Sequence, residues 1–389
     1  MGIYSVKIED IDTSLGGSGG RIVNVRTSSS HSFKTPTRPI CAEEITSKNF
    51  LGYRGEIKAP LGVLPLNING KRLERFRMNN GTVKDLGRTL QSLSDSTWLI
   101  PSFPVIQTCS PLSCERDALH KIAFEMQVKT SGLDYICMPW VDGKISEFES
   151  AVKDWSNSAE NRGFGCVIQL DMKEKPDRFG QKLDFLAEMS ETGAVSIINL
   201  RYAEPNNYPT QYAEVWSRKD SLNALINCSE IPRGVGKGSI QSEVQTKLIS
   251  YGIDSFSRKK NVLNPKAAGF LASQSPPRNL DEIAGYKMAI HSASSLIEHK
   301  VYEKIEHEYR CNCSICRGKS MTDLTNRFAY KDNGEIEKRG MVYFSHIHNH
   351  QSDQAQMDLA KTFIRSREMD NYEAIQSVER KKLEDLVRF

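Results

Sequence analysis

Three cysteines within six positions, Cys311, Cys313 and Cys316, are the residues with the clearest capacity for chemistry. A stretch rich in histidine, residues 346–350, follows about thirty positions later. Thiolates and imidazoles are preferred ligands of zinc, and a closed structural site takes four of them in a tetrahedron. The chain has only nine cysteines in 389 residues, so composition alone does not account for this spacing. Thiolates from the three cysteines and one imidazole therefore predict a structural zinc site.

A redox or disulfide role is the alternative for these cysteines. Cys311 and Cys313 are too close in sequence for an unstrained bridge, and the start of the chain, MGIYSVKIED, does not resemble a secretory signal. No apolar run approaches the roughly 20 residues needed to cross a bilayer. The composition is ordinary for a globular protein, and the net charge of +4 neither requires nor excludes nucleic acid. We therefore expect a cytoplasmic protein with reduced thiols and no membrane partner.

Short apolar runs alternate with longer amphipathic segments along most of the chain. This alternation predicts a parallel sheet with crossover helices. The runs recur about every 25 to 35 residues and no glycine-rich phosphate loop opens a helix, which favours a closed barrel, with catalysis at the carboxyl ends of its strands. The predicted strands are 97–100, 133–138, 165–170, 194–200, 224–228 and 252–256, and the predicted helices are 112–130, 146–160, 178–191, 239–250, 281–309 and 353–389.

The pattern Cys-x-Cys-x-x-Cys with a distant His-Asn pair resembles the zinc signature of tRNA-guanine transglycosylases. Other short blocks fall in the order of that family, from about residue 20 to residue 365. Each block is weak alone, and their common order makes the resemblance more specific. The blocks are Thr35-Pro36, Ser94-Asp95-Ser96, residues 163–170 (GFGCVIQL), residues 233–236 (RGVG) and residues 252–256 (GIDSF).

The resemblance implies an α/β fold of the (β/α)8 TIM-barrel type with a C-terminal zinc-binding subdomain and a terminal helix. We expect the barrel, with an N-terminal hairpin or loop, at residues 1–300. The zinc-binding subdomain would occupy residues 301–352, and the helix that packs on the barrel residues 353–389.

The resemblance also selects the zinc ligands. In the family the zinc histidine stands directly before an asparagine, which selects His348 as the partner of Cys311, Cys313 and Cys316. His346 and His350 stay open as alternatives. Four protein ligands leave no open position on the metal, so the zinc would be structural.

Members of this family are pentosyltransferases that exchange guanine in nucleic acid for a 7-deazaguanine. A carboxylate attacks the anomeric carbon of the sugar as guanine leaves, and a second acid handles the protons, as in a retaining glycosidase. By resemblance, Asp95 is the proton-handling acid and Asp254 the nucleophile that forms a glycosyl-aspartate. The residues that the resemblance implies in base contacts are Gln169, Asn199, Leu200 and Arg233.

Two departures from the family pattern bear on catalysis. The nucleophilic aspartate of the family falls at Ser257 here. Either Asp254 or a group near Ser257 then takes its role, or the chain is a non-catalytic partner subunit. The loop after Asp95 also lacks the glycine-rich motif of the tRNA enzymes.

The diverged loops favour the branch of the family that inserts a 7-deazaguanine such as preQ0 into DNA, in a bacterial cell or a phage-infected host. The basic runs 258–260 and 317–319 would then hold phosphates. A homodimer is a further implication of the resemblance. A divergent tRNA-guanine transglycosylase is the alternative enzyme. Finger-type zinc binding of DNA fits poorly, because fingers pair cysteines and histidines at other spacings.

Overall fold

The computed structural model of the chain defines the positions of most, but not all, residues. The residues that it describes are 5–13, 19–26, 32–41, 59–68, 84–85, 87–92, 102–108, 116–231, 240–242, 244–258, 287–290, 295–298, 311, 313–328 and 338–388. Within these residues, no helix is both long and apolar enough to cross a membrane.

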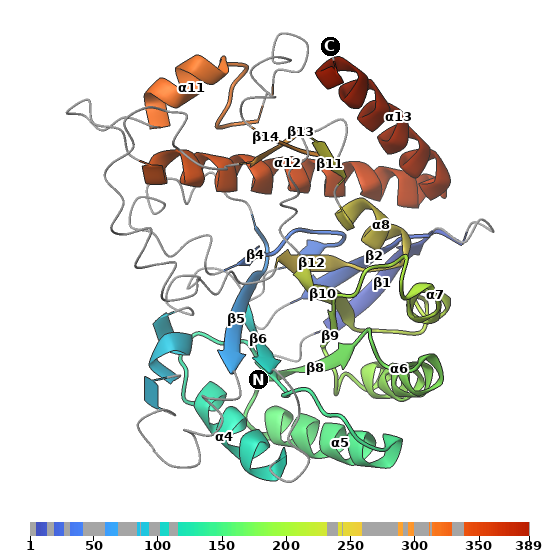
Figure 1. Ribbon diagram of the computed structural model, residues 1–389. Coiled ribbons are helices and arrows are strands. Elements are labelled where there is room, and N and C mark those ends of the chain that lie inside the picture. Colours follow the sequence, from blue (N-terminus) through green and yellow to red (C-terminus); the bar gives the residue numbers. More distant parts are fainter. Residues whose placement is uncertain are drawn as a thin grey trace.

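Eight parallel strands form the centre of the fold in the described part of the chain, in two sheets (Figure 1). The first sheet has the order β4-β5-β6 and the second β12-β10-β9-β8-β7. The strands of these sheets have apolar sequences because both faces of the sheets are buried. In β8, for example, all seven residues are buried. The strands are β4 (Ile40–Cys41), β5 (Gly62–Ile68), β6 (Ser102–Thr108), β7 (Tyr135–Cys137), β8 (Gly165–Asp171), β9 (Ile197–Arg201), β10 (Leu225–Ile231) and β12 (Ser255–Arg258).

The two sheets meet at both of their ends. Strand β6 lies beside β7. At the other junction Thr37, just before β4, forms a parallel bridge with Ser255 of β12, and its amide donates to the Asp254 carbonyl over 2.9 Å. Successive strands are thus neighbours around the whole set, which is the strand order of the expected (β/α)8 barrel.

One helix precedes each strand of the second sheet, and these helices pack against its outer face (Figure 1). In α5 the buried face is an apolar stripe of Phe148, Val152 and Trp155. Such a stripe is what a crossover helix must bury against a parallel sheet. These helices are α4 (Arg116–Val128), α5 (Ile145–Asn161), α6 (Pro176–Glu191), α7 (Pro209–Ser217) and α8 (Val244–Ser250).

An antiparallel sheet, β1 (Ser5–Ile11), β2 (Arg21–Arg26) and β3 (Ser32–Lys34), precedes the parallel strands. Its Arg21 side chain reaches the loop before β10, where it donates to the Leu222 and Ala224 carbonyls. The sheet therefore covers the amino ends of β10 and β12 and leaves their carboxyl ends uncovered by it. Where the sequence predicted an N-terminal hairpin or loop, the structure has three strands.

The C-terminal part contains a second antiparallel sheet, β11 (Ile240–Ser242), β14 (Ser295–Glu298) and β13 (Lys287–Ile290), in that order. Three helices follow, and α12 contacts both β13 and the sheet of β1 and β2. The carboxylate of Asp353 in α12 pairs with the Arg38 guanidinium over 2.8 Å, and both groups are buried. This ion pair joins α12 to the segment just before β4. The helices are α11 (Met321–Phe328), α12 (Lys338–Ser366) and α13 (Met369–Arg388).

Several predicted boundaries differ from the structure. The predicted helix 281–309 is wrong, because β13 and β14 lie inside it and pair with each other. The predicted domain boundary after residue 352 falls inside α12. The predicted helix 353–389 is broken at Arg367, whose φ of 60° is left-handed. Predicted strand 97–100 lies outside the described residues, and β5 and β6 were not predicted.

Candidate functional site

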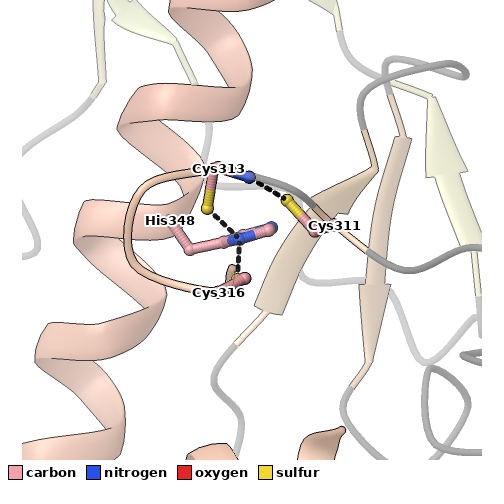
Figure 2. Close-up of side chains that lie close together, drawn as sticks. All are labelled: Cys311, Cys313, Cys316 and His348. Atoms are coloured by element: carbon pink, nitrogen blue, oxygen red, sulfur yellow. Dashed lines mark hydrogen bonds between the residues drawn. The ribbon is translucent and has the colours of Figure 1, made fainter. Parts of the chain in front are cut away.

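The four predicted metal ligands come together in the structure (Figure 2). The sulfur atoms of Cys311, Cys313 and Cys316 and one ring nitrogen of His348 all lie within 4.8 Å of one another. The Nδ1 atom of His348 is 3.0 Å from Sγ of Cys316 and 3.5 Å from Sγ of Cys313. A tetrahedral zinc ion with ordinary bond lengths would separate its ligand atoms by about 3.5 Å. The set therefore fits a metal ion of zinc's size and ligand preference.

The cysteine loop has the backbone of a closed turn. The amides of Arg317 and Gly318 donate to the carbonyls of Cys313 and Cys311 over 2.9 and 3.0 Å, and both donor residues have left-handed φ values. The Cys313 amide donates to Sγ of Cys311 over 3.4 Å, a contact that stabilises a thiolate. The turn therefore directs all three sulfurs inward.

A second element, α12, supplies the imidazole. Phe344, one turn before His348, stacks on its ring with centroids 5.9 Å apart. The Gln351 side chain bonds both the amide and the hydroxyl of Ser314, at 3.0 and 2.7 Å, which holds the cysteine loop against the helix. Side chains two residues apart on a helix do not share a face, so His350 is directed away from the cluster. The choice of His348 among the histidines agrees with the resemblance.

The electrostatics of the four groups favour a bound cation. Hydrogen bonds from Cys311 and Cys313, together with burial, raise the pKa of the Cys316 thiol. Burial lowers the pKa of His348, but contacts with the same two cysteines outweigh burial and raise it to about 10. A divalent cation would reverse the unfavourable ionisation of the thiols, because coordination removes their protons and the cation neutralises the resulting negative charge.

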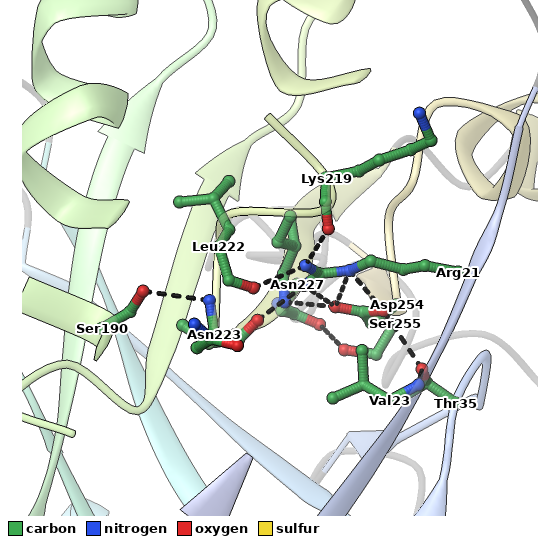
Figure 3. Close-up of polar contacts among 12 residues, drawn as sticks. Arg21, Val23, Thr35, Ser190, Lys219, Leu222, Asn223, Asn227, Asp254 and Ser255 are labelled. Carbon is green, nitrogen blue, oxygen red and sulfur yellow. Dashed lines mark hydrogen bonds and ion pairs between the residues drawn. The ribbon is translucent and has the colours of Figure 1, made fainter. Parts of the chain in front are cut away.

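Asp254, the predicted nucleophile, lies at the amino end of β12, beside Arg21 (Figure 3). It precedes β12, and its Oδ2 accepts from the Ile226 amide at the start of β10 over 2.7 Å. Its carboxylate also contacts the Arg21 guanidinium at 2.5 Å and the Thr35 hydroxyl at 3.1 Å. Barrel catalysis takes place at carboxyl ends, whereas residues at amino ends serve stability.

Burial also opposes a role for Asp254 as the nucleophile. Its side chain and that of Arg21 are both 0% exposed. Burial raises the pKa of Asp254, and the contacts with Arg21, Ile226 and Thr35 oppose that rise. Arg21 also donates to the carbonyls of Lys219, Leu222 and Ala224. The assignment of Asp254 to catalysis is thus corrected: this carboxylate joins the N-terminal sheet to the barrel.

The other predicted catalytic and base-binding residues have different outcomes. Asp95 and Arg233 lie outside the described residues, so their roles stay predictions. Ser257, at the position of the family's nucleophile, lies in β12 and is 3% exposed. Leu200 is fully buried within β9, with β8 and β10 paired on either side, which leaves its side chain in the core.

Gln169 and Asn199 belong to a chain of polar side chains inside the barrel. The Gln169 amide donates to the carbonyls of Ile106 and Met138, both over 3.0 Å, and accepts from Asn199 over 3.4 Å. Asn199 accepts in turn from Asn227 over 2.7 Å. These amides are occupied by protein groups, so the structure gives them a role in joining strands, in particular β6, β7 and β8.

The role of Gln169 as a strand connector can be tested. In the Gln169→Leu variant the carbonyls of Ile106 and Met138 lose a buried donor, and each unsatisfied group costs about 1–3 kcal/mol. We expect urea denaturation to show a loss of unfolding free energy in that range. Gln91→Leu, in an exposed amide that bonds Ser131, should change it by less than about 0.5 kcal/mol. A stable Gln169→Leu protein that has lost only its affinity for a base would contradict this interpretation.

The carboxyl ends of the strands carry a group of charged residues that the sequence did not predict. Asp171 ends β8, Arg201 ends β9 and Glu230 lies near the end of β10. The Arg201 guanidinium is 3.2 Å from the Glu230 carboxylate and 3.5 Å from that of Asp171. Trp140 lines the same hollow. We call Trp140, Asp171, Arg201 and Glu230 the mouth cluster.

The hollow is small in this conformation, with about 10 Å³ of enclosed space, enough for one water molecule. Arg201 is 36% exposed, whereas the Asp171 and Glu230 side chains are only 8% and 11% exposed. A ligand larger than water therefore needs Arg201 to move. One sequence signal was present: Asp171 and Arg201 are charged residues that directly end apolar strands.

Comparison with known proteins identifies no family. No family model and no curated protein matches the chain. The similar solved structures include the tryptophan synthase α-subunit of the hyperthermophile Pyrococcus furiosus, with a TM-score of 0.36, 15% identity, and coverage of 58% of this chain and 88% of that one. A mutant of that subunit and the subunit in its α2β2 complex each give a TM-score of 0.35 and 16% identity over 58% of this chain, covering 88% and 87% of theirs. A likeness of this size establishes no activity.

Proposed function

We propose that this chain is a zinc-containing guanine transglycosylase that exchanges guanine in DNA for a 7-deazaguanine base such as preQ0. The observation that carries the proposal is the assembly of Cys311, Cys313, Cys316 and His348. The resemblance to tRNA-guanine transglycosylases selected this histidine from three in the stretch. The cysteine spacing alone did not identify which histidine completes the site.

Zinc is the metal that we assign to this cluster. The donor set of three thiolates and one imidazole is typical of closed structural zinc sites. Bound zinc would supply folding energy and no open coordination position. Through α12, which also carries the Asp353 partner of Arg38, the site would stabilise the junction where β4 meets β12.

The mouth cluster supports base binding at the carboxyl ends of the strands. An indole such as that of Trp140 offers a face on which a base can stack. The Watson–Crick edge of guanine presents an N1–H and a 2-amino group, and a carboxylate such as that of Asp171 accepts from donors of this kind. The hollow is too small for a stacked helix to enter, so the target base would be rotated out of its duplex.

The choice of DNA over tRNA is supported by the sequence after Asp95, which lacks the family's tRNA-type pocket motif. Beside the metal loop, Arg317 and Lys319 are exposed on a surface that phosphates can reach. A tRNA-guanine transglycosylase is the alternative that the same features leave open, and the homodimer stays a prediction.

A direct exchange assay tests the proposal. We expect the purified chain to place radiolabelled guanine into duplex DNA and not into total tRNA, and unlabelled preQ0 to displace the label from the DNA. Label found only in tRNA would show that the substrate is tRNA and not DNA. Label found in neither nucleic acid would contradict the enzyme proposal.

A second candidate function has one specific observation in its favour. Asp254 is enclosed at the amino end of the strands, and Ser257 stands where the family has its nucleophile. A barrel without a nucleophile would be a non-catalytic partner subunit that binds the nucleic acid for another chain. Exchange by the purified chain alone, with no other protein present, decides against this function.

A further inference from the structure

Strand β10 has an irregularity directly beside Ser257. Cys228 pairs with Phe256 and Ile231 pairs with Arg258, so two residues of β10, Ser229 and Glu230, stand opposite one residue of β12. That one residue is Ser257. The pattern is a β-bulge, a feature that bends a strand and changes the direction of a side chain.

The bulge changes where Glu230 points. Side chains alternate along a strand, and those of Asn227 and Ser229 both reach Asn199 inside the barrel. Regular alternation would therefore direct Glu230 outward, toward the helices. Instead its φ is 63°, and its carboxylate meets Arg201 at the mouth of the barrel.

The backbone of Glu230 is costly for a residue of its type. A left-handed φ is uncommon for residues other than glycine, and such conformations cost about 1–3 kcal/mol and cluster at functional sites. Glycine would occupy this position without strain, but it would bring no carboxylate. The position thus combines a strained backbone with a charged group that the strain directs into the mouth.

The two mouth carboxylates differ in their suitability for attack. Asp171 already accepts from the Lys173 amide over 3.0 Å, and its strand β8 is separated from β12 by β9 and β10. Glu230 is on the strand next to β12. The ion pair with Arg201 also holds the Glu230 carboxylate at the mouth of the barrel.

We propose that Glu230 is the carboxylate that attacks the sugar, in place of the aspartate that the family carries at the position of Ser257. This inference rests on the proposed base exchange. The bulge in β10 thus supplies a carboxylate at the mouth, which β12 lacks because it has Ser257 at the family's nucleophile position. Arg201 is then a positioning residue, which orients Glu230 through their ion pair.

The reaction balances without an additional reactant. A Glu230 carboxylate oxygen forms a bond to C1′ of the nucleotide while the C1′–N9 bond breaks. The bonding electron pair goes to guanine, which takes a proton from an acid of the chain, the role that the resemblance gives to Asp95. The 7-deazaguanine then attacks C1′ through N9, releases its N9 proton to that acid and frees the carboxylate.

Trapping the covalent intermediate tests the assignment. The full chain is mixed with a labelled duplex, quenched in detergent and digested, and the labelled peptide is sequenced. We expect the sugar on Glu230. We also expect Glu230→Gln to form no adduct and to lose exchange by more than about a hundredfold, with an unchanged melting temperature. Glu214→Gln is the matched control, because Glu214 also pairs with an arginine, Arg218, at the end of α7 and away from the mouth.

The outcomes separate the two proposals. An adduct on any other residue, or full exchange by Glu230→Gln, overturns the role of Glu230 and leaves the proposed function in place. A wild-type chain that exchanges guanine in neither DNA nor tRNA removes the function and this assignment together. Because the peptide is mapped on the wild-type protein, the result does not depend on how well the variant folds.

Discussion

Removal of the metal is expected to unfold the cysteine loop and the part of α12 around His348. Without a cation the four polar groups stay buried, and Cys311 and Cys313 oppose ionisation of the Cys316 thiol, whereas zinc binding to such sets contributes about 10–16 kcal/mol in small peptides. Part of that energy organises the loop, so the loss of global stability will be smaller, at several kcal/mol. We expect Cys316→Ser to reproduce the effect.

The measurement combines metal content, melting temperature and hydrogen exchange. Wild type should contain one zinc per chain. Chelation or Cys316→Ser should lower the melting temperature and remove amide protection in residues 311–319 and in α12. His350→Ala is the matched control, because His350 is a buried histidine of the same helix that is outside the ligand set. The His350→Ala variant should keep its zinc. Full metal content and unchanged protection in Cys316→Ser would contradict the metal site.

Breaking the Arg21–Asp254 pair is expected to cost about 3–5 kcal/mol of unfolding free energy, because either single change leaves a buried charge without its partner. Asp254→Ala leaves the guanidinium unpaired, and Arg21→Met leaves the carboxylate unpaired. In Arg21→Met the carbonyls of Lys219, Leu222 and Ala224 also lose their donor. We therefore expect Arg21→Met to be the more damaging change.

Urea denaturation of both single variants and of the double variant Arg21→Met/Asp254→Ala measures the pair. The double variant should lose less than the sum of the two single losses, because no charge is left buried. The exposed pair of Arg88 with Asp85 provides the control, and Arg88→Met should change stability by less than about 0.5 kcal/mol. An Asp254→Ala protein with wild-type stability and no base exchange would show that Asp254 is catalytic.

The local parts of the fold could be predicted from sequence because their signals are local. Burial on both faces makes β8 and β9 continuous apolar runs, and one apolar stripe marks α5, so these elements were predicted within a few residues. Strands β13 and β14 were predicted as helix, because their stability comes from pairing with each other and with β11. A four-residue strand carries too little periodicity to show such pairing.

The candidate metal ligands were predictable for a different reason. Three thiols at such close spacing indicate metal binding, and the chemistry of zinc requires a fourth ligand. The sequence limited that ligand to a short histidine stretch. The resemblance selected His348, and the direction of its side chain on α12, toward the cysteine loop, is what the structure added.

The sequence by itself determined the alternation of strands and helices and the ligand types of the candidate metal site, since both depend on residue type and spacing along the chain. Only the tertiary structure decided which carboxylates face the mouth of the barrel. Asp254 and Glu230 both lie in or next to parallel strands, yet one stands at an amino end beneath Arg21 and the other at a carboxyl end beside Arg201. That difference depends on where each strand begins and on a bulge in β10, and both are set by pairing with neighbouring strands.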